Sequence, residues 1–167
     1  MPNDLARVAV AAMRLQNGYA LAVDTRDWTL FRTLFVPTVH AAYPHTDYSG
    51  IDEWLAEFVP FHEGCDWTLH VMTNHVVGED EHGVWATCYG RIEWTRADAP
   101  GRISRAAALY RDRLVDDGGD WRITRRTLSL LQREPGVPFP PSLVLADSVA
   151  SLQGPSPDDR DRQFPNR

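Results

Sequence analysis

Residues 17–35 read NGYALAVDTRDWTLFRTLF, and this stretch decides the fold because it contains one helix end, a polar break and a second helix. Apolar side chains leading into it recur at steps of three and four residues, which places them on one helical face: Val8, Ala12, Leu15, Tyr19 and Ala22. Asp27 precedes an apolar run with helical spacing and is therefore an N-cap signal. The pattern predicts helices over residues 4–24 and 27–35.

The polar break also contains Asp24, at the expected end of the first helix. The macrodipole is negative there and disfavours a carboxylate by about 0.3–1 kcal/mol. An acid in this position either faces solvent in a turn or points into a cavity and takes part in chemistry.

The rest of the chain changes from helical spacing to alternation. A short alternating segment predicts a strand over 38–43, the run PHTDYSG predicts a turn, and apolar residues at helical spacing predict a third helix over 49–59, ended by Pro60. From Asp66 on the apolar period is two, which predicts strands over residues 67–78, 84–95, 103–115 and 121–132. Long strands joined by short turns form an antiparallel meander, so the predicted class is α+β.

Composition limits the possible partners. The chain has 167 residues, is 43% apolar and 24% charged, and carries a net charge of −6 with no basic run, which argues against nucleic acid. No apolar run reaches transmembrane length and no signal-peptide pattern opens the chain, so no membrane contact is expected. Cys65 and Cys88 lack metal-type spacing and are interpreted as reduced thiols of a cytoplasmic protein.

A change in composition near residue 134 predicts a domain boundary. Seven of the twelve prolines lie beyond it. Residues 1–133 are expected to form one domain, and residues 134–167 a Pro-rich extension that is partly disordered. Within the extension, residues 142–152 are apolar enough to dock on a surface, such as that of a partner subunit.

The runs YALAVDTRDWTLFRTLF, DWTLHVMTNHVV and LYRDRLVDDGGDWRITRRTLSLL resemble the SnoaL-like branch of the nuclear transport factor 2-like (NTF2-like) superfamily, over about residues 5–133. The resemblance implies an α+β cone in which three N-terminal helices pack on a strongly curved antiparallel sheet and enclose a pocket. Its members include dehydratases, isomerases, polyketide cyclases, epoxide hydrolases, small dioxygenase subunits and non-catalytic binders, so function must be argued from the site.

The same resemblance points to catalytic residues. Asp24 and His70 match the acid and the strand histidine that dehydratase relatives place in the pocket. A carboxylate beside an imidazole fixes the tautomer of the ring and makes it a usable acid–base group. Sequence separation alone does not guarantee that these two side chains meet.

Two tyrosines match dehydratase patterns in the same way. Tyr43 falls where a tyrosine polarises the substrate carbonyl, and Tyr19 lies a little more than one turn before Asp24. Each phenol is either a donor to a developing oxyanion or a core side chain with its hydroxyl at the rim. Val23 departs from the scytalone dehydratase pattern, which has a tyrosine before the acid.

Other polar residues have weaker assignments. Tyr89, Arg91 and Glu93 share one strand face by period two, and Tyr89 and Glu93 are candidate substrate-binding residues; Glu93 alternatively pairs with Arg91 or Arg96 on the surface. Arg126 binds a substrate anion or pairs with Asp112. His75 has the opposite parity to His70 and faces the other side of the sheet unless a bulge intervenes. The remaining histidines are expected in solvated turns or loops: His40, His45, His62 and His82.

No metal-type spacing is present, so neither a metal nor a cofactor is predicted. Two functional hypotheses follow. The first is a cofactor-independent lyase, isomerase or cyclase acting on a hydrophobic, oxygenated small molecule, such as a polyketide or a steroid-like compound. The second is a non-catalytic binder or a structural subunit like the small subunits of ring-hydroxylating dioxygenases. The resemblance also implies a homodimer formed through the sheet face away from the helices.

Overall fold

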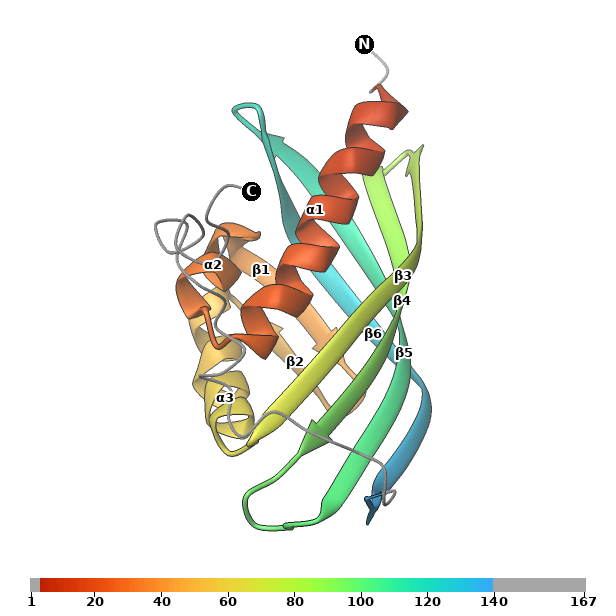
Figure 1. The fold of residues 1–167 in the computed structure, drawn as a ribbon. Coiled ribbons are helices and arrows are strands. Elements are labelled where there is room, and N and C mark those ends of the chain that lie inside the picture. Colours follow the sequence, from red (N-terminus) through yellow and green to blue (C-terminus); the bar gives the residue numbers. More distant parts are fainter. Residues whose placement is uncertain (1–3, 140–167) are drawn as a thin grey trace, which may run out of the picture.

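The computed structural model describes residues 4–139, and in this range three helices pack on one six-stranded sheet. The elements follow the order α1 (Leu5–Asp24), α2 (Trp28–Thr33), β1 (Phe35–Tyr43), β2 (Thr46–Ser49), α3 (Ile51–Glu63), β3 (Trp67–Asp80), β4 (Gly83–Thr95), β5 (Arg102–Asp117) and β6 (Asp120–Pro138). Figure 1 shows α1 crossing one face of the sheet, with α2 and α3 beside β1 and β2. The α+β class predicted from the sequence is confirmed.

The first helix forms as its sequence predicts. The side chain of Asp4 caps its N-terminus by accepting a hydrogen bond from the backbone N–H of Ala6. All members of the predicted apolar stripe are buried: Val8, Ala12, Leu15, Tyr19 and Ala22. The predicted cap of the second helix is present as well, because Asp27 accepts from the backbone N–H of Leu30 at 2.8 Å. Burial of these stripes against the sheet builds the main core.

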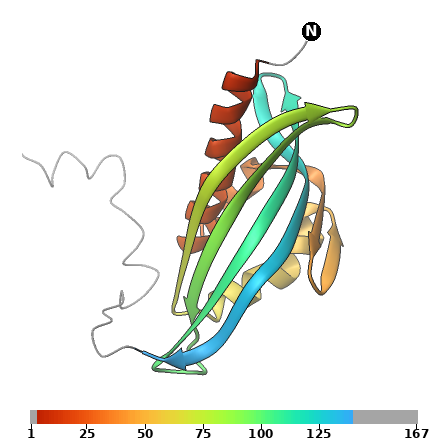
Figure 2. The same cartoon turned by 90° about the vertical axis from the view of Figure 1, so that its right-hand side faces the viewer.

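The sheet is not a pure antiparallel meander, because β1 and β2 join it beside β6. The strand order is β2-β1-β6-β5-β4-β3, and β1 runs parallel to β6 while the other pairs are antiparallel. The run predicted as a turn over 44–50 contains β2, which forms a hairpin with β1. Both features depend on pairing between segments, which local turn chemistry does not reveal. Figure 2 shows the long strands bending along their length, so that the sheet curves around the helices.

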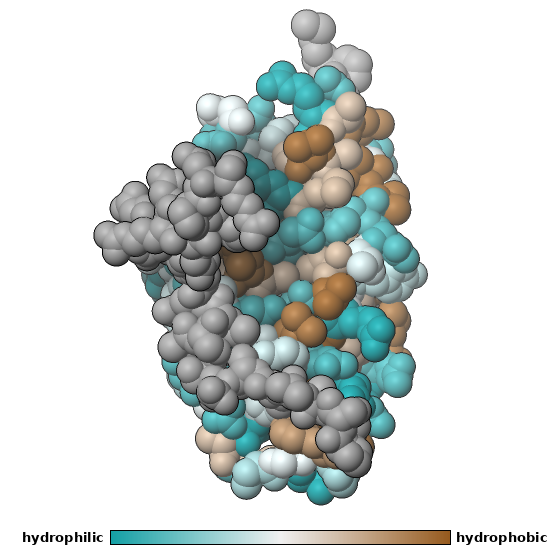
Figure 3. Space-filling view, viewed as in Figure 1, coloured by the Kyte–Doolittle hydropathy of each residue, from teal (hydrophilic) through white to brown (hydrophobic). Residues whose placement is uncertain are grey.

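Surface composition differs between the two faces. On the face seen in Figure 3, apolar side chains lie scattered among polar ones. On the sheet face away from the helices, four apolar side chains of β3 and β4 are exposed: Leu69, Val71, Val76 and Tyr89. Homodimer formation through that face stays a prediction, and the apolar segment 142–152 lies outside the described residues. Strand β6 continues to Pro138, five residues beyond the predicted domain boundary at 133.

Candidate functional site

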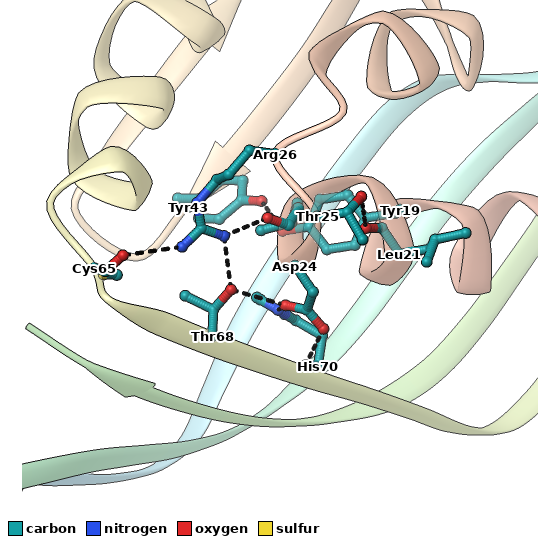
Figure 4. A network of polar contacts seen from close by, with 10 residues as sticks. Tyr19, Leu21, Asp24, Thr25, Arg26, Tyr43, Cys65, Thr68 and His70 are labelled. Carbon is teal, nitrogen blue, oxygen red and sulfur yellow. Dashed lines mark hydrogen bonds and ion pairs between the residues drawn. The ribbon is translucent and has the colours of Figure 1, made fainter. Parts of the chain in front are cut away.

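Asp24 is the last residue of α1, and its carboxylate turns toward β3 and not toward bulk solvent. Its Oδ2 accepts the backbone N–H of His70 at 2.8 Å, and its Oδ1 lies 2.7 Å from Nδ1 of the same residue. The two side chains are 15% and 4% exposed, for Asp24 and His70 respectively. Figure 4 shows the acid and the imidazole facing each other between the helix end and the strand. The predicted contact between these two residues is present.

This contact sets the tautomer of His70. A carboxylate accepts hydrogen bonds, so Nδ1 carries the proton. In the neutral ring Nε2 is then a lone-pair acceptor. His70 lines an apolar cavity, so Nε2 of the neutral ring can accept a proton from a ligand bound there.

Arg26 and Thr68 explain why an acid is tolerated at a helix C-terminus. The Thr68 hydroxyl donates to Oδ1 of Asp24 at 3.0 Å, and Nη1 of Arg26 donates to the Thr68 oxygen at 2.8 Å and to the Val23 carbonyl. Arg26 adopts a left-handed backbone conformation with φ +58°, which ends the helix and turns the guanidinium back on it. Burial lowers the pKa of Arg26, while the nearby acidic groups, Asp24 included, oppose this shift. Its positive charge offsets the unfavourable end of the dipole.

The cavity has a volume of about 420 Å³ and lies between α3, the β1–β2 hairpin and the inner sheet face. Most of its walls are aromatic or aliphatic. The lining consists of Tyr19, Tyr43, Pro44, His45, Thr46, Tyr48, Glu57, Phe58, Phe61, His62, Thr68, His70, Ile92, Trp94, Ala106, Tyr110 and Leu128. An apolar cleft with a few convergent polar groups is typical of a small-molecule site.

Tyr19 and Tyr43 both reach this cavity and contact each other. Their hydroxyl oxygens are 3.3 Å apart, and the ring of Tyr19 meets that of His70 edge to face at a centroid distance of 5.8 Å. Burial raises the pKa of Tyr19 and raises that of Tyr43 well above its ordinary value. Both phenols therefore stay protonated near neutral pH, so they can donate hydrogen bonds to a ligand oxygen.

Tyr89 and Glu93, two of the predicted substrate-binding residues, lie on the sheet face away from the cavity. Tyr89 is 45% exposed on the opposite sheet face, and Glu93 there accepts from Nε of Arg105 at 3.1 Å. They share one face of β4 as expected, but the inner face belongs to the alternate residues, such as Ile92 and Trp94, which line the cavity. Period-two counting tells which residues of a strand share a face, but it does not tell which face the helices cover.

Arg126 is fully buried and pairs with Asp112, so the structure contains the second of its two predicted roles. Nε and Nη2 of Arg126 donate to the two carboxylate oxygens at 2.8 and 2.7 Å. The guanidinium lies 4.3 Å from the ring centroid of Tyr19 and is not part of the cavity lining. Burial disfavours its charge, but the Asp112 carboxylate outweighs burial and raises the pKa of Arg126. Arg126 thus packs against the ring of Tyr19 without reaching the cavity.

Comparison with family models matches residues 6–127 to the SnoaL-like domain. The chain belongs to the SnoaL-like family. No curated protein is significantly similar to it. Among solved structures, this SnoaL-like domain is similar to a proposed scytalone dehydratase of Novosphingobium aromaticivorans, at 16% identity and TM-score 0.69, covering 87% of this chain and 94% of the other. A hexachlorocyclohexane dehydrochlorinase, LinA-type3 of Novosphingobium barchaimii, is similar at 17% identity and TM-score 0.67, covering 83% and 99%.

A third solved structure is that of a nuclear transport factor 2-like (NTF2-like) superfamily protein from Salmonella enterica. It is similar to this chain at 17% identity and TM-score 0.67, covering 80% of this chain and 96% of the other. At these identities the solved structures show the fold alone. The resemblance predicted from the sequence is confirmed at the level of family and fold.

His62 is a residue of this SnoaL-like domain that sequence reasoning misplaced. It was expected in a solvated loop because Pro60 was expected to end the helix, but α3 continues through Pro60 to Glu63. His62 is consequently helical, only 5% exposed, and part of the cavity wall. Its Nδ1 lies 2.7 Å from the carbonyl oxygen of Phe58, one turn earlier. A proline can occupy the last turn of a helix when side-chain packing outweighs one missing hydrogen bond.

His75 lies on the helix side of the sheet because β3 contains a bulge. The pairing with β4 shifts between Thr73 and Val76, and Asn74 has φ +58°. Nδ1 of His75 lies 2.7 Å from Oε1 of Gln16, whose amide nitrogen donates to Asp112 at 3.0 Å. An asparagine within an alternating run was the available signal, since asparagine tolerates a left-handed conformation.

Between residues 4 and 139, no three His, Cys, Asp or Glu side chains lie together as potential metal ligands. No helix in that range is long and apolar enough to cross a membrane.

Proposed function

We propose that the protein is a cofactor-independent lyase, isomerase or cyclase that acts by acid–base chemistry on a hydrophobic, oxygenated small molecule, such as a polyketide or steroid-like compound. The observation that carries this proposal is the Asp24–His70 pair, 2.7 Å apart, at the wall of an apolar cavity. The names of two structural neighbours, dehydratase and dehydrochlorinase, describe elimination reactions and support the same class of chemistry.

His70 is the proposed base. In a dehydration, Nε2 takes a proton from the carbon next to a carbonyl, and the electrons of that C–H bond form an enolate. The imidazolium then returns a proton to a hydroxyl on the following carbon, which leaves as water while the C=C bond forms. Asp24 keeps the reactive nitrogen free and stabilises the imidazolium between these steps. In an isomerisation the proton returns to a different carbon instead.

Tyr43 and Tyr19 are the proposed oxyanion donors. Their hydroxyls are 3.3 Å apart and line the same cavity as His70. A phenol that is already oriented donates to the enolate oxygen more strongly than to the ground-state carbonyl, which lowers the barrier. Such a donor is most effective where water is largely excluded.

The alternative, a non-catalytic binder or a structural subunit, makes a different geometric demand. It expects Asp24 and His70 apart and a pocket filled by the protein's own side chains. The 2.7 Å contact and the cavity of about 420 Å³ favour the enzyme.

Exchange of protons at an activated carbon tests the proposal without knowledge of the natural substrate. The bicyclic ketone 2-tetralone is incubated with the protein in D₂O, and the loss of its α-proton signals is followed by NMR. We expect the parent chain to accelerate exchange and His70→Ala or Asp24→Asn to lower the rate by about 10²–10⁴-fold. Asp66→Asn, an exposed carboxylate near the same strand, is the matched control.

Equal exchange rates for the parent chain, His70→Ala and Asp24→Asn would show that the pair is not the acid–base group. If the parent chain binds 2-tetralone without exchanging its protons, the binder is the correct reading of the cavity.

A further inference from the structure

The cavity contains a second imidazole that the proposed mechanism does not use. His62 reaches it from α3, whereas His70 reaches it from β3, and their ring centroids are 6.4 Å apart. This separation is too large for a direct hydrogen bond between the rings. His62 can therefore contact a ligand independently of His70.

The tautomer of His62 follows from its one hydrogen bond. A backbone carbonyl can only accept, so the 2.7 Å contact with the Phe58 oxygen requires the proton on Nδ1. A neutral imidazole carries a single N–H, which leaves a lone pair on Nε2. Nδ1 turns back on its own helix, so Nε2 lies on the ring edge farther from that helix turn.

The ring stays neutral at physiological pH. Burial lowers the pKa of His62 to about 3, and the nearby His70 and Arg26 act in the same direction. The carbonyl of Phe58 opposes this shift but does not outweigh burial. Nε2 is consequently an acceptor and not a donor whenever the fold is intact near neutral pH.

No hydrogen bond to Nε2 of His62 occurs within the described part of the chain, although the residue is only 5% exposed. Aromatic neighbours hold the ring in place: Phe58 packs on it at a centroid distance of 4.0 Å, and Trp28 meets it edge to face at 6.1 Å. An acceptor that aromatic side chains hold in place in an apolar cavity wall gains free energy when a ligand supplies a donor.

We propose that His62 is a hydroxyl-binding subsite, in which Nε2 accepts a hydrogen bond from a hydroxyl group of the substrate. The substrate class is thereby narrowed to compounds that carry a hydroxyl donor in addition to the group that reacts at His70. A ligand with only ether or carbonyl oxygens would leave the His62 acceptor unpaired. The inference rests on the proposed function only in taking this cavity as the substrate site.

Two compounds of nearly equal shape test the subsite by binding alone. The probes are 2-naphthol, which donates a hydrogen bond, and 2-methoxynaphthalene, which cannot. Isothermal titration calorimetry on the full chain should give a preference of about three- to tenfold for 2-naphthol, the value of one hydrogen bond. In His62→Phe, which keeps a ring but removes the acceptor, the preference should fall to about one. His82→Phe, which replaces an exposed histidine outside the cavity, should keep it.

Histidine NMR on the unsubstituted chain guards against a fold defect in His62→Phe. Long-range ¹H–¹⁵N spectra should show His62 protonated on Nδ1, with its Nε2 resonance shifting when 2-naphthol is added. A preference that persists in His62→Phe, equal or absent binding of the two probes by the parent chain, or a His62 signal unmoved by 2-naphthol would each overturn the subsite. These outcomes are independent of deuterium exchange at 2-tetralone, so the subsite and the catalytic proposal can fail separately.

Discussion

The hydroxyl of Thr68 donates a 3.0 Å hydrogen bond to Oδ1 of Asp24, the same oxygen that faces Nδ1 of His70. Thr68 also accepts from Arg26, so a continuous chain of polar contacts runs from the guanidinium through the hydroxyl to the carboxylate (Figure 4). Three groups thus fix the position of Asp24: this hydroxyl, the backbone N–H of His70 and the imidazole. The acid–base pair is held by its surroundings as well as by its own contact.

Thr68→Val should therefore lower the rate at which the protein exchanges the α-protons of 2-tetralone, although Asp24 and His70 are both still present. The loss of one hydrogen bond to a charged acceptor corresponds to about 1.5–3 kcal/mol, or about 10–100-fold if it acts fully on the orientation of Asp24. The measurement is the exchange rate at saturating 2-tetralone, followed by NMR. Thr68→Ser, which keeps the hydroxyl, should recover most of the rate.

Thr73→Val is the matched control, because Thr73 lies on the same strand and is exposed. Should Thr68→Val and Thr68→Ser exchange equally slowly, the effect arises from packing of the methyl group and the hydroxyl has no positioning role.

Gly90 makes room for Tyr110 in the wall of the cavity. A Cβ at this position would lie 2.6 Å from Cε2 of the Tyr110 ring and 3.3 Å from the sulfur of Met72, both on the inner face. Gly90→Ala should push the ring toward the ligand, lower the free energy of unfolding by about 1–3 kcal/mol and weaken the binding of 2-naphthol. Urea unfolding and calorimetry measure these two effects.

Gly78→Ala is the control for Gly90→Ala, because it crowds a side chain on the sheet face away from the cavity. Its Cβ would lie 2.3 Å from the ring of Trp85, which belongs to the opposite face and does not line the cavity. We expect lower stability with unchanged 2-naphthol affinity. Equal losses of 2-naphthol affinity in Gly90→Ala and Gly78→Ala would mean that displacement of Tyr110 does not cause the weaker binding.

Local patterns were sufficient for the parts of the site that depend on one element. The stripe of α1 and the cap at Asp27 follow from spacing and from one side-chain hydrogen bond, and both are present. The pairing of Asp24 with His70 required the family resemblance, because nothing local brings a helix end to a strand 46 residues away.

The errors arose where a competing contact overrides a local rule. His62 was missed because packing on Phe58 and the Nδ1 hydrogen bond carry α3 beyond Pro60. Tyr89 and Glu93 were correctly predicted to share one face of their strand, but alternation alone does not tell which of the two faces the helices cover. The parallel pairing of β1 with β6 likewise depends on contacts between segments far apart in the sequence.

The buried pair of Arg126 and Asp112 should be sensitive to the loss of either partner. Arg126→Met leaves Asp112 fully buried with only the amide of Gln16 as a partner, which should lower the free energy of unfolding by about 3–5 kcal/mol. The double variant Arg126→Met/Asp112→Leu should recover much of this loss, because no uncompensated charge remains. Urea unfolding measures all three chains.

Arg32→Met provides the surface comparison for this ion pair. Arg32 lies 2.6 Å from Asp52, but the two side chains are 49% and 85% exposed, so less than about 1 kcal/mol is expected. A similar loss in Arg126→Met and Arg32→Met would contradict the importance assigned to burial.

His62 should make the fold sensitive to mild acid. Its folded-state pKa is lowered from 6.5 to about 3 by burial, so between these values the unfolded chain binds a proton that the folded chain does not. Stability rises with pH wherever the unfolded state binds more protons, so the contribution of His62 is complete above pH 6.5 and is lost as the pH falls toward 3. The expected slope from this residue is about 1.4 kcal/mol per pH unit.

The slope is isolated by comparing chains, since carboxylates also titrate in this range. His62→Phe removes the titrating ring, so its free energy of unfolding should fall less steeply than that of the parent chain between about pH 6 and pH 4. His82→Gln, which removes an exposed histidine side chain, is the surface comparison. Parallel curves for all three chains would mean that the folded and the unfolded chain bind a proton at His62 equally, so burial would not lower the pKa of this ring.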